Sequence, residues 1–188
     1  EILYDENGKF KGIKSNGECA YGKYLIAEPS YVKNTNKLKS KGKVIRCICI
    51  MDHPVPKTKD VPSCQIILPQ RQTGRKNDIF IVLNHTHCVC KKGYYLAIIS
   101  TNVETDNPES ELTKAFEVIG AVKEKFINVS DVYEPVDTTF SDNVYVTSSF
   151  DPLSHFEFDT QNVIDLYEKM TGTKLDLEIE ENEGEAQQ

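Results

Sequence analysis

The sequence lacks any apolar run long enough to cross a membrane. A spanning helix needs about 20 consecutive apolar residues, whereas the longest stretches here, Val44–Met51 and Tyr94–Ile99, have the length of strands. No secretory signal pattern is found, and the chain begins at Glu1, inside an expected strand. We therefore expect a piece of a longer protein.

Glycine-rich phosphate-binding loops are also missing. The sequence contains neither G-x-G-x-x-G nor G-x-x-x-x-G-K-[ST], the patterns that place backbone N–H groups around phosphates. No pair of carboxylates stands out as a general acid and base. These absences exclude a nucleotide or dinucleotide site built by this chain alone, and they leave catalysis without an evident residue set.

An excess of positive charge is missing as well. The formal net charge is −7, and six acidic residues lie in Leu175–Gln188, which contains no base. Without them the remaining chain carries about −1, so it has no electrostatic footprint for nucleic acid. We expect residues 173–188 to form a disordered acidic tail. Its acidic residues are Asp176, Glu178, Glu180, Glu181, Glu183 and Glu185.

One group of basic side chains is concentrated between residues 33 and 46. Small polar residues separate its members, which favours an exposed loop between two sheet elements. A contact with an acidic partner or an anionic membrane is the alternative. The members are Lys33, Lys37, Lys39, Lys41, Lys43 and Arg46.

The six cysteines are scattered in a way that differs from a small secreted scaffold, which favours reduced thiols in a cytosolic protein. Cys47 and Cys49 lie on one face of an apolar strand, so we expect them to pack in the core. A reactive thiol would need a nearby base or helix N-terminus, and the sequence shows neither.

The segment from His85 to Cys90 contains two histidines and two cysteines, which suggests zinc. In a strand over Thr86–Cys90, however, His85 and His87 would point to one face and Cys88 and Cys90 to the other. The spacing also differs from that of zinc fingers and ribbons. We therefore favour a structural role over a metal site.

A Ser/His/Asp set can be assembled from Asp151, Ser154 and His155. The members of a catalytic triad converge from different elements, and neighbours in sequence rarely form one. A loop or helix-capping role is the better interpretation. No catalytic, cofactor-binding or metal-binding residue is predicted.

Alternating and continuous apolar runs predict a series of strands whose short spacing favours antiparallel hairpins. Val44–Met51 is apolar at nearly every position, so we expect it to be covered on both faces. The other predicted strands are Glu1–Tyr4, Lys9–Lys14, Tyr24–Ala27, Cys64–Leu68, Asp78–Leu83, Tyr94–Ser100, Phe126–Tyr133 and Val144–Ser149.

Two helices are predicted. Asn107-Pro108 opens the first, with Asn at the cap and Pro in the first turn. The second covers Thr160–Met170 and ends at Gly172. Its expected inner face is Val163, Ile164, Tyr167 and Met170. The fold class lies between α/β and α+β, with a mixed sheet and few helices.

Longer motifs resemble the Rab GDP dissociation inhibitor family in order and spacing, over nearly the whole chain. They include Leu25–Val32, Gly42–Ile50, His53-Pro54, Ser63–Gln70, Arg75–Ile79, Gly93–Thr101, Val103–Thr105, Ile127–Pro135, His155–Glu157 and Ile164–Gly172. The resemblance implies the C-terminal part of a flavoprotein-like, two-layer fold. Residues 1–41 would end a layer resembling FAD/NAD(P)-binding domains, and residues 42–143 would form an inserted mixed sheet like that of FAD-linked reductases. Residues 144–172 would return to the first layer.

The resemblance also implies a function. Such a protein binds GDP-bound, geranylgeranylated Rab GTPases, slows GDP release and carries them between membrane and cytosol. It is not an enzyme, and it uses no cofactor, small-molecule substrate or nucleic acid. Its main Rab platform and lipid pocket would lie before Glu1, so no partner-binding residue is assigned. The alternative is a fragment of a flavin-dependent oxidoreductase of the same superfold.

Overall fold

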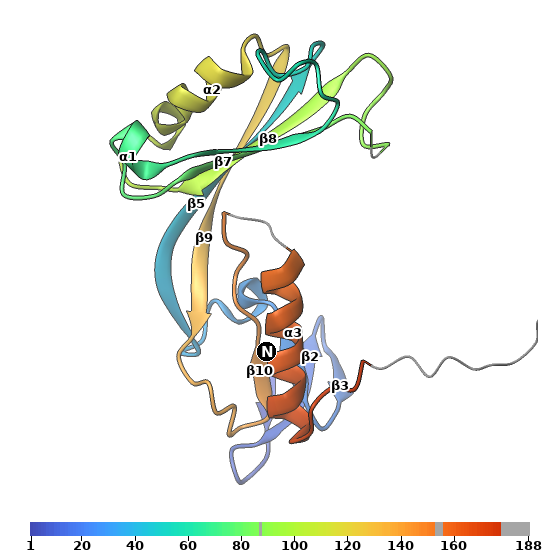
Figure 1. The fold of residues 1–188 in the computed structure, drawn as a ribbon. Helices are drawn as coiled ribbons and strands as arrows, with labels where there is room; N and C mark the ends of the chain where they lie inside the picture. The colour runs from blue at the N-terminus through green and yellow to red at the C-terminus, as the bar shows by residue number, and fades with distance from the viewer. Residues whose placement is uncertain (87, 153–155, 178–188) are drawn as a thin grey trace, which may run out of the picture.

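The computed structural model describes residues 1–86, 88–152 and 156–177. Its ribbon forms two lobes, and two long strands, β5 (Leu38–Met51) and β9 (Glu124–Pro135), run from one lobe into the other (Figure 1). The two lobes are therefore joined by a ribbon of paired strands rather than by a single linker.

The upper lobe in Figure 1 is a five-stranded sheet in the order β6-β7-β8-β5-β9. All four neighbouring pairs are antiparallel, as the short spacings predict. The remaining strands are β6 (Cys64–Leu68), β7 (Ile79–Asn84) and β8 (Tyr95–Asn102). The short helix α1 (Gln70–Thr73) follows β6.

One face of this sheet is covered by η2 (Pro108–Leu112) and α2 (Thr113–Ile119). Asn107 caps the first turn, because its side chain accepts a hydrogen bond from the backbone N–H of Ser110. Gly120 ends α2 with φ 84°, a conformation that suits glycine. The predicted start of this helix is confirmed, although its first turn is a 3-10 helix.

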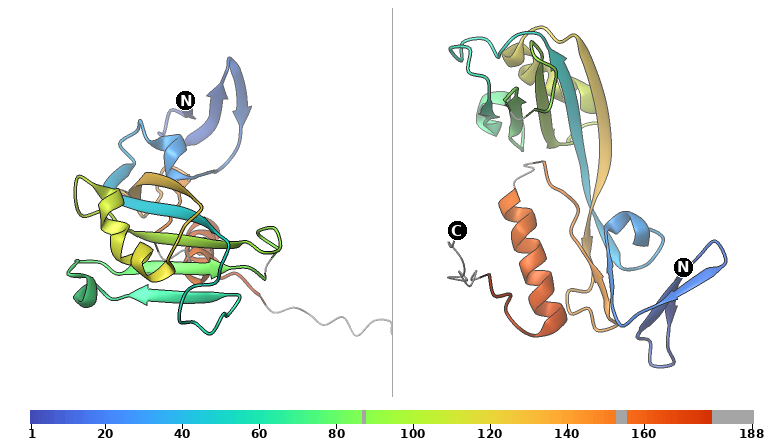
Figure 2. Two further views of the ribbon diagram at one scale, coloured as in Figure 1. Left: turned by 90° about the horizontal axis from the view of Figure 1, so that it is seen from above. Right: turned by 90° about the vertical axis from the view of Figure 1, so that its right-hand side faces the viewer.

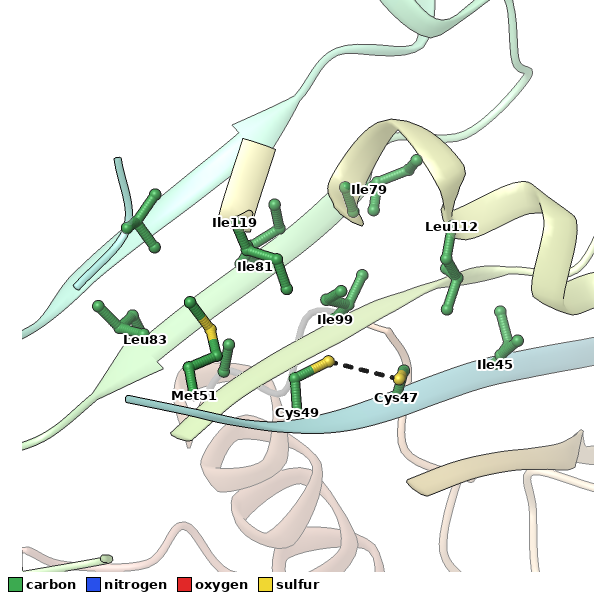
Figure 3. Close-up of a cluster of buried hydrophobic side chains, with 13 residues drawn as sticks. Ile45, Cys47, Cys49, Met51, Ile79, Ile81, Leu83, Ile99, Leu112 and Ile119 are labelled. Carbon is green, nitrogen blue, oxygen red and sulfur yellow. Dashed lines mark hydrogen bonds between the residues drawn. The ribbon is translucent and has the colours of Figure 1, made fainter. Parts of the chain in front are cut away.

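The main core lies between this face and α2 (Figure 3). Alternate residues of β5, from Ile45 to Met51, point into it and are fully buried. The prediction that Val44–Met51 is covered on both faces is wrong, because Ile48 on the opposite face is exposed. An antiparallel sheet can leave one face open, whereas the apolar composition had suggested a strand buried on both faces.

The second lobe contains smaller sheets. Strands β1 (Ile2–Tyr4), β2 (Phe10–Ser15) and β3 (Glu18–Tyr21) form an antiparallel sheet that projects away from α3 (Phe156–Thr171) (Figure 2). Strand β4 (Leu25–Ala27) pairs in parallel with β10 (Val144–Val146). The 3-10 helix η1 (Pro29–Val32) follows β4. The second core is Phe10, Ala27, Val32, Val144 and Val146.

Helix α3 begins four residues before the predicted start, and Gly172 ends it as predicted. Ile164, Tyr167 and Met170 are half-buried, but Val163 is exposed, so its assignment to the inner face is wrong. No residue of α3 is fully buried. The helix thus rests on the second lobe with a narrow apolar stripe.

The β5–β9 pair contains a bulge where the lobes meet. Ser40 pairs with Tyr133 and Gly42 with Val132, which leaves Lys41 as an extra residue. Gly42 has φ 118°, a left-handed conformation that favours glycine. The expected boundary between residues 41 and 42 falls within β5, at this bulge. The mixed α/β class with few helices is confirmed, and the acidic tail from Glu178 onward lies outside the described residues.

The predicted strand over Thr86–Cys90 is wrong. The described part of this segment is a loop between β7 and β8. Cys88 has φ 55°, which interrupts an extended strand.

Candidate functional site

A cleft of about 600 Å³ lies between the five-stranded sheet and the second lobe. Lys41, Gly42 and Lys43 of β5 form one wall, and Lys76 and Asn77 form another. Phe80, Val103, Val132 and Pro152 add apolar surface. Asp78 and Asp151 also line it, so the cleft combines ammonium, carboxylate and amide groups with apolar side chains, which suits a polar peptide segment better than a small apolar ligand.

A buried ion pair holds the Lys76-Asn77 wall in place. Arg75 Nη1 lies 2.6 Å from Glu111 Oε2, and Arg75 Nη2 lies 3.3 Å from Glu104 Oε1. The side chains of Arg75 and Glu111 are only 10% and 3% exposed. Arg75 Nη2 also donates to the carbonyl oxygen of Asn102 at 2.8 Å. The guanidinium therefore joins the segment before β7 to the end of β8 and to η2.

Backbone groups complete the network. Glu111 Oε1 accepts from the backbone N–H of Thr105 at 2.7 Å and from that of Glu104 at 3.0 Å. Glu104 Oε1 accepts from the backbone N–H groups of Lys76 and Asn77 at 3.0 and 2.9 Å. Both carboxylates thus fix loop backbone as well as the arginine, as buried charges require.

These contacts set the protonation of both carboxyl groups. Burial by itself raises the pKa of Glu111, but hydrogen bonds from Thr105, Arg75 and backbone N–H groups outweigh it and hold that pKa below its usual range. The pKa of Glu104 is lowered in the same way, against burial, by Asn77, the backbone of Lys76 and the charge of Arg75. Both groups are therefore carboxylates at neutral pH.

Most members of the basic cluster form ion pairs, and those from Lys39 to Arg46 lie on a strand. Lys39, Lys41 and Lys43 are part of β5, so the predicted exposed loop is wrong for them. Lys41 lies 2.7 Å from Glu134 Oε2 and Lys39 lies 3.4 Å from Glu134 Oε1. Further pairs join Lys33 with Asp131 and Lys37 with Asp142. The register of β5 against β9 places Glu134 opposite Lys39 and Asp131 opposite Lys43. These acids, together with Asp142, reduce the positive field that the sequence alone suggests.

Of the three residues considered as a triad, only Asp151 lies within the described residues. The backbone carbonyl oxygens of Asp151 and Pro152 accept hydrogen bonds from Arg46 and Ser100, which holds residues 149–152 across the open face of the sheet. Ser154 and His155 lie outside the described residues. A packing role is thus observed for the described part of this segment.

Two described residues of the His85–Cys90 segment contact the same backbone oxygen. His85 Nδ1 and Cys90 Sγ both contact the carbonyl oxygen of Tyr94, at 2.7 and 3.1 Å. Cys88 is exposed, and His87 lies outside the described residues. Within residues 1–86, 88–152 and 156–177, no three His, Cys, Asp or Glu side chains form a metal-binding group.

Cys47 and Cys49 pack in the main core, as predicted, with their Sγ atoms 3.5 Å apart (Figure 3). The contact with Cys47 and the burial of the thiol raise the pKa of Cys49 strongly. The thiol therefore stays protonated and unreactive.

Among the described helices, none has the length and apolar character to span a bilayer.

Comparison with known proteins identifies the family. A model of the family described as GDP dissociation inhibitor matches residues 1–182. The chain belongs to this family. A probable secretory pathway GDP dissociation inhibitor of Schizosaccharomyces pombe is 46% identical over 94% of the chain, and Rab GDP dissociation inhibitor beta of Rattus norvegicus is 42% identical over 95%. The chain spans 40% of the length of each.

A solved family member has the same fold. The crystal structure of Rab GDI from Plasmodium falciparum superposes with a TM-score of 0.89 at 46% identity, over 94% of this chain and 40% of that one. These GDP dissociation inhibitors are named as regulators rather than enzymes. The expected family resemblance is confirmed.

Sequence reasoning missed the ionic network that shapes the cleft. Arg75 and Glu104 lie in two of the motifs that carried the resemblance, and Glu111 follows the predicted helix start at Asn107-Pro108. Arg75 and Glu111 are 36 residues apart, so no local pattern relates them. The sequence offered one indication of a structural role for these residues. Arg75 and Glu104 are charged residues inside motifs for which no catalytic role was found.

Proposed function

We propose that this chain is part of a Rab GDP dissociation inhibitor that binds GDP-bound, prenylated Rab GTPases and slows their release of GDP. Membership of the GDP dissociation inhibitor family over residues 1–182 carries the proposal. The chain spans 40% of the length of its relatives. The activity therefore belongs to a longer protein, to which this part contributes supporting sheets.

The proposed cycle needs no chemistry. The longer protein shelters the geranylgeranyl groups of the Rab and carries it through the cytosol, with transient membrane contact. Shielding a prenyl chain from water is favourable by about 0.8 kcal/mol per CH2 group, which lets a carrier compete with a bilayer. Neither a cofactor nor a small-molecule substrate takes part, and nucleic acid is not a partner.

We assign the residue ranges to layers as the family resemblance implies. Residues 1–41 and 144–172 belong to the layer resembling FAD/NAD(P)-binding domains, and residues 42–143 form the inserted sheet. The cleft beside Lys43 and Lys76 is the surface of this portion that we assign to a polar segment of the Rab. Its support is the mixed lining of ammonium, carboxylate, amide and apolar groups.

The deciding experiment measures GDP release from a prenylated Rab with and without the full-length protein. We expect slower release with the protein, and unchanged release would refute the proposal. Residues 1–188 alone should bind the Rab weakly, because the main platform is expected elsewhere. Flavin released on denaturation of the full-length protein would support the oxidoreductase alternative instead.

The role of the cleft is tested separately. Lys43→Glu with Lys76→Glu should weaken Rab binding by the full-length protein at least several-fold, and Lys114→Glu on the exposed surface of α2 is the matched control. Equal affinities of the two variants would remove the cleft from the binding surface and leave the main proposal intact.

A further inference from the structure

The hairpin between β2 and β3 turns on an asparagine followed by a glycine. Ser15 pairs with Glu18, so Asn16 and Gly17 alone form the turn. Both have a positive φ, 50° and 87°, which fits a type I′ turn, the form that Asn-Gly favours. All four residues are exposed, and a Cβ built on Gly17 would meet nothing within 4 Å. The turn is therefore open to water.

The polar groups at the tip of this turn are free to react. Within the described residues, neither the side-chain amide of Asn16 nor the backbone N–H of Gly17 has a hydrogen-bond partner. A bond from the Gly17 nitrogen to Cγ of Asn16 would close a five-membered ring. Glycine has no side chain that would hinder this approach. The turn thus places a backbone nitrogen and a side-chain amide in a reactive sequence.

The β2–β3 hairpin can also open locally. Strand β3 pairs with β2 through four residues, and all four residues of β3 are exposed. In the described part of the chain no strand covers its other edge. Segments with few buried contacts open before the core does. Opening lets the backbone of Asn16 rotate out of the turn conformation, which ring closure requires.

A second Asn-Gly pair provides an internal comparison. Asn7-Gly8 lies in the turn between β1 and β2, where its N–H groups are bound. The N–H of Gly8 donates to the carbonyl oxygen of Asp5 at 3.1 Å. Asp5 Oδ1 accepts from the backbone N–H groups of Asn7 at 2.9 Å and Lys9 at 2.8 Å. The nitrogen that would attack is therefore held in this turn and free in the β2–β3 turn.

We propose that Asn16 is a deamidation site, at which the side-chain amide becomes a carboxylate through a succinimide. The Gly17 nitrogen gives up its proton and bonds to Cγ of Asn16, and the side-chain nitrogen leaves as ammonia with that proton. Water then opens the ring at one of its two carbonyl groups. One opening gives aspartate and the other gives isoaspartate, so water is the only co-reactant.

The two products change the hairpin differently. Aspartate adds a negative charge two residues before Glu18, but Asp-Gly still suits a type I′ turn. Isoaspartate inserts an additional methylene into the backbone, and the turn then no longer fixes the register of Ser15 against Glu18. The isoaspartyl form should release β3, while Phe10 keeps β2 in the second core. The inference does not depend on Rab binding, so either can fail without the other.

Peptide mapping of the aged full-length protein tests the site. Trypsin cleaves after Lys9, Lys14 and Lys23, so mass spectrometry reads the two Asn-Gly pairs in separate peptides. After incubation of the native protein near pH 8, we expect Asn16 to deamidate at least tenfold faster than Asn7. In urea the two rates should be similar, because only the folded structure distinguishes the pairs. A native rate at Asn16 no higher than at Asn7 overturns the proposal, and so does the same rate ratio in urea.

A pair of variants gives an independent readout. Asn16→Gly removes the amide and keeps the turn, because Gly-Gly also forms type I′ turns, and Asn7→Gly is the matched control. A methyltransferase that esterifies isoaspartyl carboxyl groups with S-adenosylmethionine should label peptide 15–23 from aged wild type and from Asn7→Gly, but not from Asn16→Gly. Equal labelling of that peptide in both variants, or no labelling in wild type, would contradict isoaspartate formation at this turn.

Discussion

Removing the guanidinium of Arg75 should destabilise the protein more than any exposed charge change. Arg75→Met leaves Glu111, whose side chain is 3% exposed, and Glu104 without their cation. Breaking a buried ion pair by removing one partner costs about 3–5 kcal/mol. We expect the lower part of that range, about 3 kcal/mol, because backbone N–H groups still hydrogen-bond both carboxylates.

Chemical denaturation followed by far-UV circular dichroism measures this loss, since the chain has no tryptophan to report by fluorescence. Lys114→Met is the matched control, because it breaks an exposed pair with Glu117 at 3.1 Å. Such pairs contribute less than about 1 kcal/mol. A loss below about 1 kcal/mol for Arg75→Met would refute the view that the network fixes the cleft wall.

The same variant has a predictable pH dependence. The folded-state pKa values of Glu104 and Glu111 are lowered from the ordinary value of 4.5. Their contribution to stability is therefore complete above pH 4.5 and is lost as pH falls through the lowered folded-state values. The stability difference between wild type and Arg75→Met should shrink below pH 4.5. A difference that stays constant down to pH 3 would contradict the assignment.

Two further predictions concern the core and its border. Gly120→Ala should lower the free energy of unfolding by about 1–3 kcal/mol, because φ 84° with ψ −146° is strained for alanine. The new Cβ would also lie 3.3 Å from His53 Cε1. The midpoint of denaturant unfolding measures this loss. Thiol labelling of the native protein at pH 8, mapped by mass spectrometry, should modify the exposed Cys19 and Cys88 within minutes and leave Cys49 unmodified.

Gly8→Ala is the control for the glycine prediction. Gly8 also has a positive φ, 72°, but a Cβ there would meet nothing within 4 Å. An equal loss for both variants would show that backbone strain alone, and not the contact with His53, sets the effect.

Rapid labelling of Cys49 in folded protein would contradict its place in the core.

Local patterns predicted the strands well because alternation and turn residues are properties of neighbouring positions. Cys64–Leu68 and the helix start at Asn107 agree with the structure for this reason. A strand was predicted over Thr86–Cys90, but the described residues of this segment form a loop. A pattern of apolar and polar residues does not reveal a positive φ such as that of Cys88.

The candidate site was less predictable, since it depends on long-range pairing. The register of β5 against β9 places Glu134 opposite Lys39, and nothing near the lysines in sequence announces it. The Arg75–Glu111 pair depends on how η2 packs over the sheet. The family, by contrast, was predictable from sequence, because many motifs in a fixed order identify a family more specifically than one small group of candidate site residues does.

The continuous strands β5 and β9 have a consequence for how the protein unfolds. Leu38 packs against the second core and Ile45 lies in the first, yet both belong to one strand. Melting either core frees one end of a hydrogen-bonded ladder that the other core still anchors. Cooperative units often coincide with such motifs, so the two lobes should lose protection from solvent together. A cut at residue 41 would not release two independent modules, because it severs the ladder that both share.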